Sequence, residues 1–129
     1  MASILVIDDE RSFLKMLHGM LSAVGHQVDV AEDGPGGFAK FRESKHDLVI
    51  TDIFMPGQNG IATIESIREV RADVKVIAVS GGGNPSPLDL GSRMDYLEVA
   101  QRRGADRILR KPFEWEEVVD VVEEVLKAS

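Results

Sequence analysis

Strand-like and helix-like patterns alternate along the whole chain, and this alternation restricts the possible folds more than any other feature. Short β-branched apolar runs, typical of buried strands, are each followed by apolar residues at helical spacing. Strands are predicted at 3–7, 27–31, 48–51, 74–79 and 107–110, and helices at 12–24, 36–44, 61–71, 92–103 and 114–127. Strands that alternate with helices form a parallel sheet covered on both faces. We therefore predict an α/β fold with a doubly wound, five-stranded parallel sheet.

Composition narrows the class of protein further. With 129 residues, 43% of them hydrophobic, the chain is large enough for one core, so we expect a single domain over 1–129 with no output domain. A formal net charge of −7 argues against binding to nucleic acid. The absence of cysteine excludes disulfides and thiolate metal sites. No apolar run approaches the roughly 20 residues needed to span a bilayer, so no membrane contact and a cytoplasmic location are predicted.

Charged residues stand at the ends of three of the predicted strands. Asp8 and Asp9 follow the first strand, Asp52 follows the third, and Lys111 comes directly after the fifth. Parallel strands would bring all four groups to one carboxyl edge, where open α/β sheets hold ligands. Clustered carboxylates repel one another and call for a cation, and Mg²⁺ suits them because it binds carboxylates together with phosphate oxygens. With Lys111 as a positive charge for an anion, the pattern indicates phosphoryl chemistry.

Each of these residues also has an ordinary interpretation. The Asp8 and Asp9 pair would suit the start of a helix, Asp52 would suit a turn before Met55-Pro56-Gly57, and Lys111-Pro112 would suit a loop. The coincidence of all of them at strand ends favours the site. Three histidines, His18, His26 and His46, are expected at the surface or at helix ends. The stripe Val118, Val121, Val122 and Val125 is expected in the core, with Trp115 half-buried at the start of the last helix.

A set of short motifs at the strand ends resembles a known family. The motifs are Val6-Ile7-Asp8-Asp9-Glu10, Asp52-Ile53-Phe54-Met55-Pro56-Gly57, Ser80 after the fourth strand, Gly104-Ala105-Asp106, and Lys111-Pro112-Phe113. Together and in this order, they resemble the receiver domain of two-component response regulators, of the stand-alone, chemotaxis-regulator-like kind, from end to end of the chain. The resemblance implies a flavodoxin-like strand order 2-1-3-4-5 with five helices on both faces.

The resemblance also implies roles for individual residues. Asp52 would be the phosphoacceptor, a carboxylate nucleophile that takes a phosphoryl group from a histidine kinase or a histidine phosphotransfer protein. Asp9 would bind Mg²⁺ directly and Asp8 through water. The implied metal ligands are Asp8, Asp9, Asp52 and the backbone carbonyl of Phe54, and the implied contacts to phosphoryl oxygens are Lys111 and Ser80. Such a protein would catalyse only its own phosphorylation and dephosphorylation, mainly by positioning and charge, and would signal to a protein target that the sequence does not identify.

Two departures from the family pattern concern the conformational switch. The segment 81–91 is longer than usual and rich in glycine, which predicts a mobile loop that phosphorylation would order. Ile108 stands where the family commonly has an aromatic residue that turns inward with the hydroxyl residue, here Ser80. The usual aromatic rotation is therefore not expected in this chain.

Other functions remain open at the level of sequence. An interaction module without phosphate is disfavoured by the intact acidic residues. A Mg²⁺-dependent phosphatase that uses an aspartyl phosphate commonly has a second acid two positions after the nucleophile. This chain has Phe54 at that position, which disfavours a phosphatase. Relay of phosphate to a phosphotransfer protein, direct output to a target and a role as a phosphate sink are not ranked.

Overall fold

The computed structural model describes residues 2–55, 58–80, 96–111 and 113–128. Its elements in chain order are β1 (Ser3–Ile7), α1 (Arg11–Ala23), β2 (Gln27–Ala31), α2 (Gly34–Glu43), β3 (Leu48–Asp52), β4 (Phe54–Met55), β5 (Gln58–Asn59), α3 (Gly60–Val70), β6 (Lys75–Ser80), α4 (Tyr96–Arg102), β7 (Arg107–Arg110) and α5 (Trp115–Lys127). The predicted start of the fourth helix at 92 and the predicted mobile loop at 81–91 lie outside the described residues. No helix within the described ranges is long and apolar enough to cross a bilayer.

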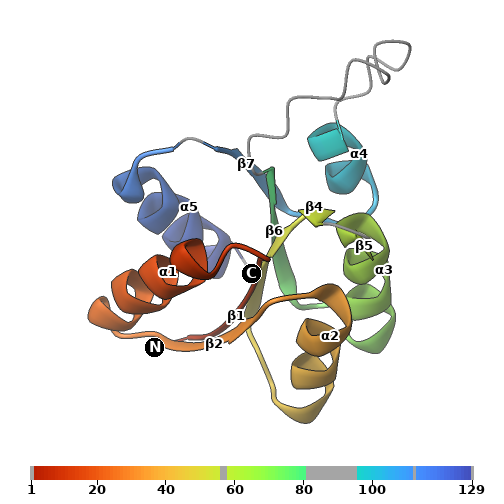
Figure 1. The fold of residues 1–129 in the computed structure, drawn as a ribbon, viewed down its shortest axis with the longest axis horizontal. Helices are drawn as coiled ribbons and strands as arrows, with labels where there is room; N and C mark the ends of the chain where they lie inside the picture. Colours follow the sequence, from red (N-terminus) through yellow and green to blue (C-terminus); the bar gives the residue numbers. More distant parts are fainter. Residues whose placement is uncertain (1, 56–57, 81–95, 112, 129) are drawn as a thin grey trace.

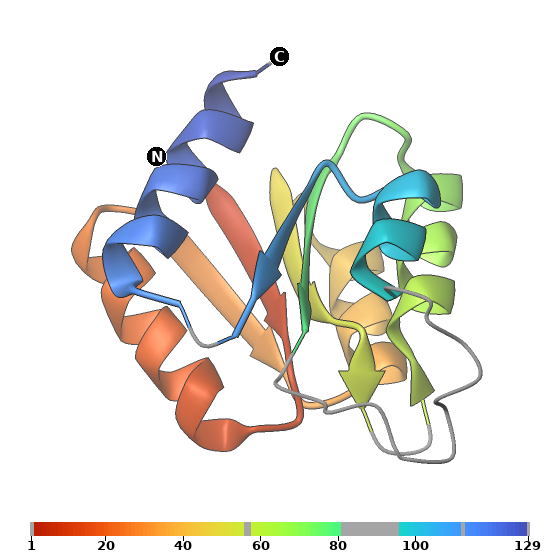
Figure 2. The ribbon, with the colours of Figure 1, turned by 90° about the horizontal axis from the view of Figure 1, so that it is seen from above.

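The five long strands form one parallel sheet in the order β2-β1-β3-β6-β7. Counted along the chain, this is the predicted order 2-1-3-4-5, which is therefore confirmed, as is the doubly wound arrangement. Helices α1 and α5 cover one face, and α2, α3 and α4 cover the other (Figures 1 and 2). Since parallel strands run the same way, the ends of β1, β3, β6 and β7 lie at one edge of the sheet (Figure 2).

Apolar side chains pack on both faces of the sheet, which explains the continuous apolar strands. On the face of α1 and α5, one cluster contains the predicted valine stripe of α5, together with Ile4, Val6 and Phe13. On the other face, a second cluster contains Leu5, Ile7, Val49 and, from α3, Ile64 and Ile67. Because successive strand residues point to opposite faces, a strand between two helical layers needs an apolar residue at every position.

A short hairpin between β3 and α3 was not predicted. Its strands, β4 and β5, have two residues each and pair antiparallel, so they are too short to show an alternating pattern. Helix α3 then begins at Gly60, directly against the strand that carries Asp52. A Cβ atom on Gly60 would lie 2.4 Å from the backbone oxygen of Asp52 and 2.5 Å from the Cα of Ile53. Only glycine allows the helix to start this close.

Arg68, near the end of α3, ties several segments together at the opposite, N-terminal edge of the sheet. Its Nε donates to the carbonyl of Gly104 at 3.0 Å, and its Nη1 donates to the carbonyl of Val74. Its Nη2 lies 2.7 Å from Oδ2 of Asp106, and the same carboxylate accepts from the backbone N–H of Val76 at 2.8 Å. One side chain therefore joins α3 to the starts of β6 and β7.

Of the three histidines expected at the surface or at helix ends, His46 lies just after α2, but it is buried. This side chain is 1% exposed, its Nε2 lies 2.8 Å from Oδ2 of Asp29, and its ring stacks on Phe41 with a centroid separation of 6.1 Å. His18 is exposed on α1, and His26 lies just after that helix. The sequence around a single histidine between a helix and a strand does not indicate whether the side chain is buried. Here His46 is covered by the ring of Phe41.

Candidate functional site

The three predicted aspartates lie together at the carboxyl edge of the sheet. Asp8 and Asp9 follow β1, and Asp52 is the last residue of β3. These strands are hydrogen-bonded neighbours, with Ile7 opposite Thr51, so both end at the same level. One carboxylate oxygen from each aspartate lies within 4.8 Å of the others. The clustering expected from strand order is therefore present.

Burial sets the electrostatic character of this cluster. Asp8 is fully buried and Asp52 is 2% exposed, whereas Asp9 is exposed. Burial raises the pKa of Asp8 above its usual value, although a hydrogen bond from the backbone N–H of Glu10 and the nearby Lys111 act in the opposite direction. A buried carboxylate loses its hydration, and this disfavours the charged form.

The ordinary interpretations of these acids are wrong. Helix α1 has Glu10 as its N-cap and no side-chain capping bond, so neither Asp8 nor Asp9 caps it. Asp52 belongs to a buried strand and not to a turn.

Lys111 reaches into the cluster from the end of β7. Its Nζ lies 3.0 Å from Oδ2 of Asp8 and 3.6 Å from Oε1 of Glu10, and its side chain is 15% exposed. Its backbone N–H donates to the carbonyl of Ser80 at 3.0 Å, so Ser80 and Lys111 stand side by side at the ends of β6 and β7. The sequence predicted this gathering. It did not predict the contact with Glu10, or that Nζ lies 3.7 Å from the ring centroid of Phe13.

The donor set fits a hard divalent cation. Three carboxylates face one ammonium group, so the cluster carries an excess of negative charge that a cation would neutralise. Mg²⁺ prefers oxygen ligands, keeps several waters and is usually held by one or two protein carboxylates. Asp8, Asp9 and Asp52 would hold it. The backbone carbonyl of Phe54, the first residue of β4, stays a predicted ligand.

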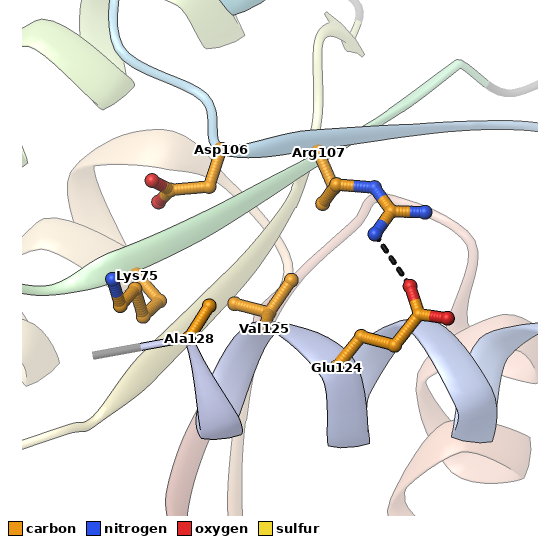
Figure 3. A pocket seen from close by; sticks show the side chains of 6 residues that line it. All are labelled: Lys75, Asp106, Arg107, Glu124, Val125 and Ala128. Carbon is orange, nitrogen blue, oxygen red and sulfur yellow. Dashed lines mark hydrogen bonds and ion pairs between the residues drawn. The ribbon is translucent and has the colours of Figure 1, made fainter.

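A pocket elsewhere in the protein lacks these features. It lies where β6 and β7 begin, beside the end of α5, and has a volume of about 190 Å³. Its lining residues are Lys75, Asp106, Arg107, Glu124, Val125 and Ala128 (Figure 3). Arg107 and Glu124 form an ion pair across it, and Asp106 is bound to Arg68. Its two acidic side chains are thus each paired with an arginine, unlike the excess of acids at the carboxyl edge.

The buried charge of Asp8 should cost stability when no metal is bound. Since folding raises the pKa of Asp8 above 3.8, the ionised side chain opposes folding at neutral pH, and this cost disappears as pH falls through the raised value towards 3.8. With a chelator at pH 7, we expect Asp8→Asn to be more stable than wild type by about 0.5–2 kcal/mol. Urea unfolding at pH 7, 5 and 4 should show this gain shrinking with acidity, whereas the exposed control Asp9→Asn should change little. A less stable Asp8→Asn at pH 7 would contradict the argument.

Comparisons with known proteins agree with the geometry. The model of the response regulator receiver domain matches residues 4–123. The DNA-binding transcriptional regulator NtrC of Azospirillum brasilense is 32% identical over 128 residues, which are 99% of this chain and 25% of that protein. Among solved structures, the receiver domain of NtrX from Brucella abortus has a TM-score of 0.85 at 30% identity, covering 98% of this chain and 99% of that one.

A further solved structure was obtained with a metal ion. The response regulator protein TrrA from Thermotoga maritima, in complex with Mg²⁺ and BeF, has a TM-score of 0.78 at 32% identity and covers 97% of this chain and 99% of that one. The chain spans about a quarter to a half of the length of the curated relatives NtrC and ResD.

Proposed function

The chain belongs to the response regulator receiver domain family, and from this membership we propose that Asp52 accepts a phosphoryl group from a phosphohistidine in a Mg²⁺-dependent reaction. The observation that carries the proposal is the cluster of Asp8, Asp9 and Asp52 within 4.8 Å, with the ammonium of Lys111 beside it. The Mg²⁺ named for TrrA of Thermotoga maritima supports the choice of metal.

The reaction transfers a phosphoryl group from a histidine nitrogen of the donor to a carboxylate oxygen of Asp52. A carboxylate oxygen of Asp52 attacks the phosphorus, the P–N bond to histidine breaks, and the imidazole leaves with a proton in place of the phosphoryl group. The product is an acyl phosphate, which water later hydrolyses to inorganic phosphate and the free carboxylate. The protein contributes positioning and charge stabilisation more than covalent chemistry, so its activity is confined to its own phosphorylation and dephosphorylation.

The residues around Asp52 divide this work. Asp9 would hold the metal directly and Asp8 through a water molecule, and the metal would neutralise charge on the phosphoryl oxygens. Lys111 pairs with one phosphoryl oxygen, and the hydroxyl of Ser80, at the end of β6, donates to another. Ile108 is partly buried against the apolar cluster of α3. The aromatic rotation that is common in the family therefore has no counterpart at this position.

Partners follow from the same proposal. The phosphoryl donor is a sensor histidine kinase or a histidine phosphotransfer protein, and the phosphorylated form acts on a further protein. The curated relatives NtrC and ResD are transcriptional regulators by name. We propose only that the 129 residues of this chain, with a net charge of −7, do not themselves bind nucleic acid. The cytoplasmic location stays a prediction.

Labelling with a small phosphoryl donor tests the function. Incubation with acetyl phosphate and Mg²⁺, followed by mass spectrometry of the intact protein, should show one added phosphoryl group, located by peptide analysis at Asp52. A chelator should prevent labelling. Absence of label with Mg²⁺ would favour the phosphate-independent interaction module. Repeated turnover of p-nitrophenyl phosphate would favour the phosphatase.

A further inference from the structure

The ammonium group of Lys111 lies over the face of an aromatic ring, a contact that the metal and phosphoryl chemistry do not require. Its Nζ is 3.7 Å from the ring centroid of Phe13, and the lysine side chain is 15% exposed. A cation within about 6 Å of a ring centroid is attracted by the negative face of the ring, more strongly where water is excluded. This attraction adds to the contacts that the ammonium makes with Asp8 and Glu10.

Other aromatic side chains fix the ring of Phe13. It lies in the first turn of α1 and is 9% exposed. Phe113 packs edge-on against it, with centroids 6.0 Å apart and an interplanar angle of 66°, and Trp115 packs edge-on against Phe113 at 6.3 Å. Such edge-to-face pairs hold rings in preferred orientations. The face of Phe13 is therefore kept towards Lys111.

We propose that Phe13 is a positioning residue that holds the ammonium of Lys111 beside the acid cluster while the metal is bound. The inference deepens the proposed function and rests on it. The carboxylate of Asp8 is the nearest partner of Lys111, at 3.0 Å, and a cation held by this carboxylate, even through water, would compete with Lys111 for it and weaken that contact. The ring carries no ligand for the metal, so its attraction to the ammonium persists.

Glu10 does not hold the ammonium as well as the ring does. Its carboxylate is 3.6 Å from Nζ, and its side chain is 56% exposed. Exposed ion pairs contribute little because water and salt compete for both charges. Phe13, by contrast, is nearly buried, so it supplies a fixed contact from which Lys111 can reach a phosphoryl group on Asp52.

Stepwise fluorination of the ring tests the proposal. Site-specific replacement of Phe13 by mono-, di- and trifluorophenylalanine withdraws electron density from the ring face and changes its shape little. We expect the rate of phosphorylation by acetyl phosphate at saturating Mg²⁺ to fall with each fluorine, by on the order of threefold in total, and Phe13→Leu to lose at least as much. The dissociation constant for Mg²⁺ should not rise. The same fluorinated residues at Phe41, which packs on the other face of the sheet, should leave the rate unchanged.

A second measurement follows the contact without any phosphorylation. A ring placed over the ammonium shifts the NMR signals of the Lys111 ε-methylene protons upfield, relative to those of the exposed Lys127. We expect this shift to persist when Mg²⁺, and then beryllofluoride, is added. Collapse of the shift on addition of Mg²⁺, or an equal rate across the fluorinated series in a protein that is labelled at Asp52, would overturn the proposal. If wild type takes no label, the proposed function fails, and the NMR shift still decides whether Phe13 retains Lys111.

Discussion

Phosphorylation is expected to be lost completely when Asp52 is replaced by asparagine. The amide is nearly the same size as the carboxylate, but its oxygen is a far weaker nucleophile and cannot form an acyl phosphate. Asp8 and Asp9 lie in the same cluster, but the family resemblance assigns them as metal ligands and not as phosphoacceptors. After treatment with acetyl phosphate and Mg²⁺, mass spectrometry should therefore detect no phosphoryl group on Asp52→Asn.

Two controls make this result interpretable. Asp120→Asn changes the same charge on an exposed position of α5 and should be labelled like wild type. Unfolding curves should show that Asp52→Asn remains folded, since the substitution keeps the volume of a side chain that is 2% exposed. Label that persists in Asp52→Asn would place the phosphoacceptor on another residue.

Removal of the Asp9 carboxylate should weaken Mg²⁺ binding by at least tenfold, which corresponds to about 1.4 kcal/mol. Asp9 is expected to bind the metal directly, and a small cation held by only one or two carboxylates depends strongly on each of them. Asp8→Ala should have a smaller effect, because its expected contact is through water. Metal titration followed by the fluorescence of Trp115, near the site through Phe113 and Phe13, would give the dissociation constants.

Asp120→Ala is the matched control for the change in net charge and should bind Mg²⁺ like wild type. Equal affinity in Asp9→Ala and wild type would show that Asp9 is not a direct ligand. A larger loss in Asp8→Ala than in Asp9→Ala would reverse the assignment of the two aspartates, and it would fit the deeper burial of Asp8.

Features with a regular period were accessible from the sequence, and contacts between distant side chains were not. The central strands were predicted because a segment buried on both faces has consecutive apolar residues, as at 4–7 in β1 and 48–50 in β3. The aspartates were predicted because each stands at the end of such a strand. The hairpin of β4 and β5 was missed because two-residue strands have no period, and the burial of His46 was missed because it depends on Phe41 and Asp29.

Phe13 shows the same limit inside the site. It lies in the core, on the apolar face of α1. Nothing in the apolar spacing of this helix indicated that its face lies under Lys111, because the two residues meet only after β1 and β7 have taken their places in the sheet. Sequence patterns therefore gave the acids and the lysine of the site but not the groups that orient them.

The hydrogen bonds of Arg68 hold the N-terminal edge of the sheet more firmly than the carboxyl edge. They fasten α3 to the starts of β6 and β7, at Val74 and Asp106, whereas the proposed chemistry takes place where the same strands finish. The hydrogen-bonded ends of these strands should therefore move less than the ends that carry the site. Displacements caused by a phosphoryl group on Asp52 should be smallest around Arg68 and should increase along β6 towards Ser80. Phosphorylation should therefore move the carboxyl ends of the strands and leave α3 in place.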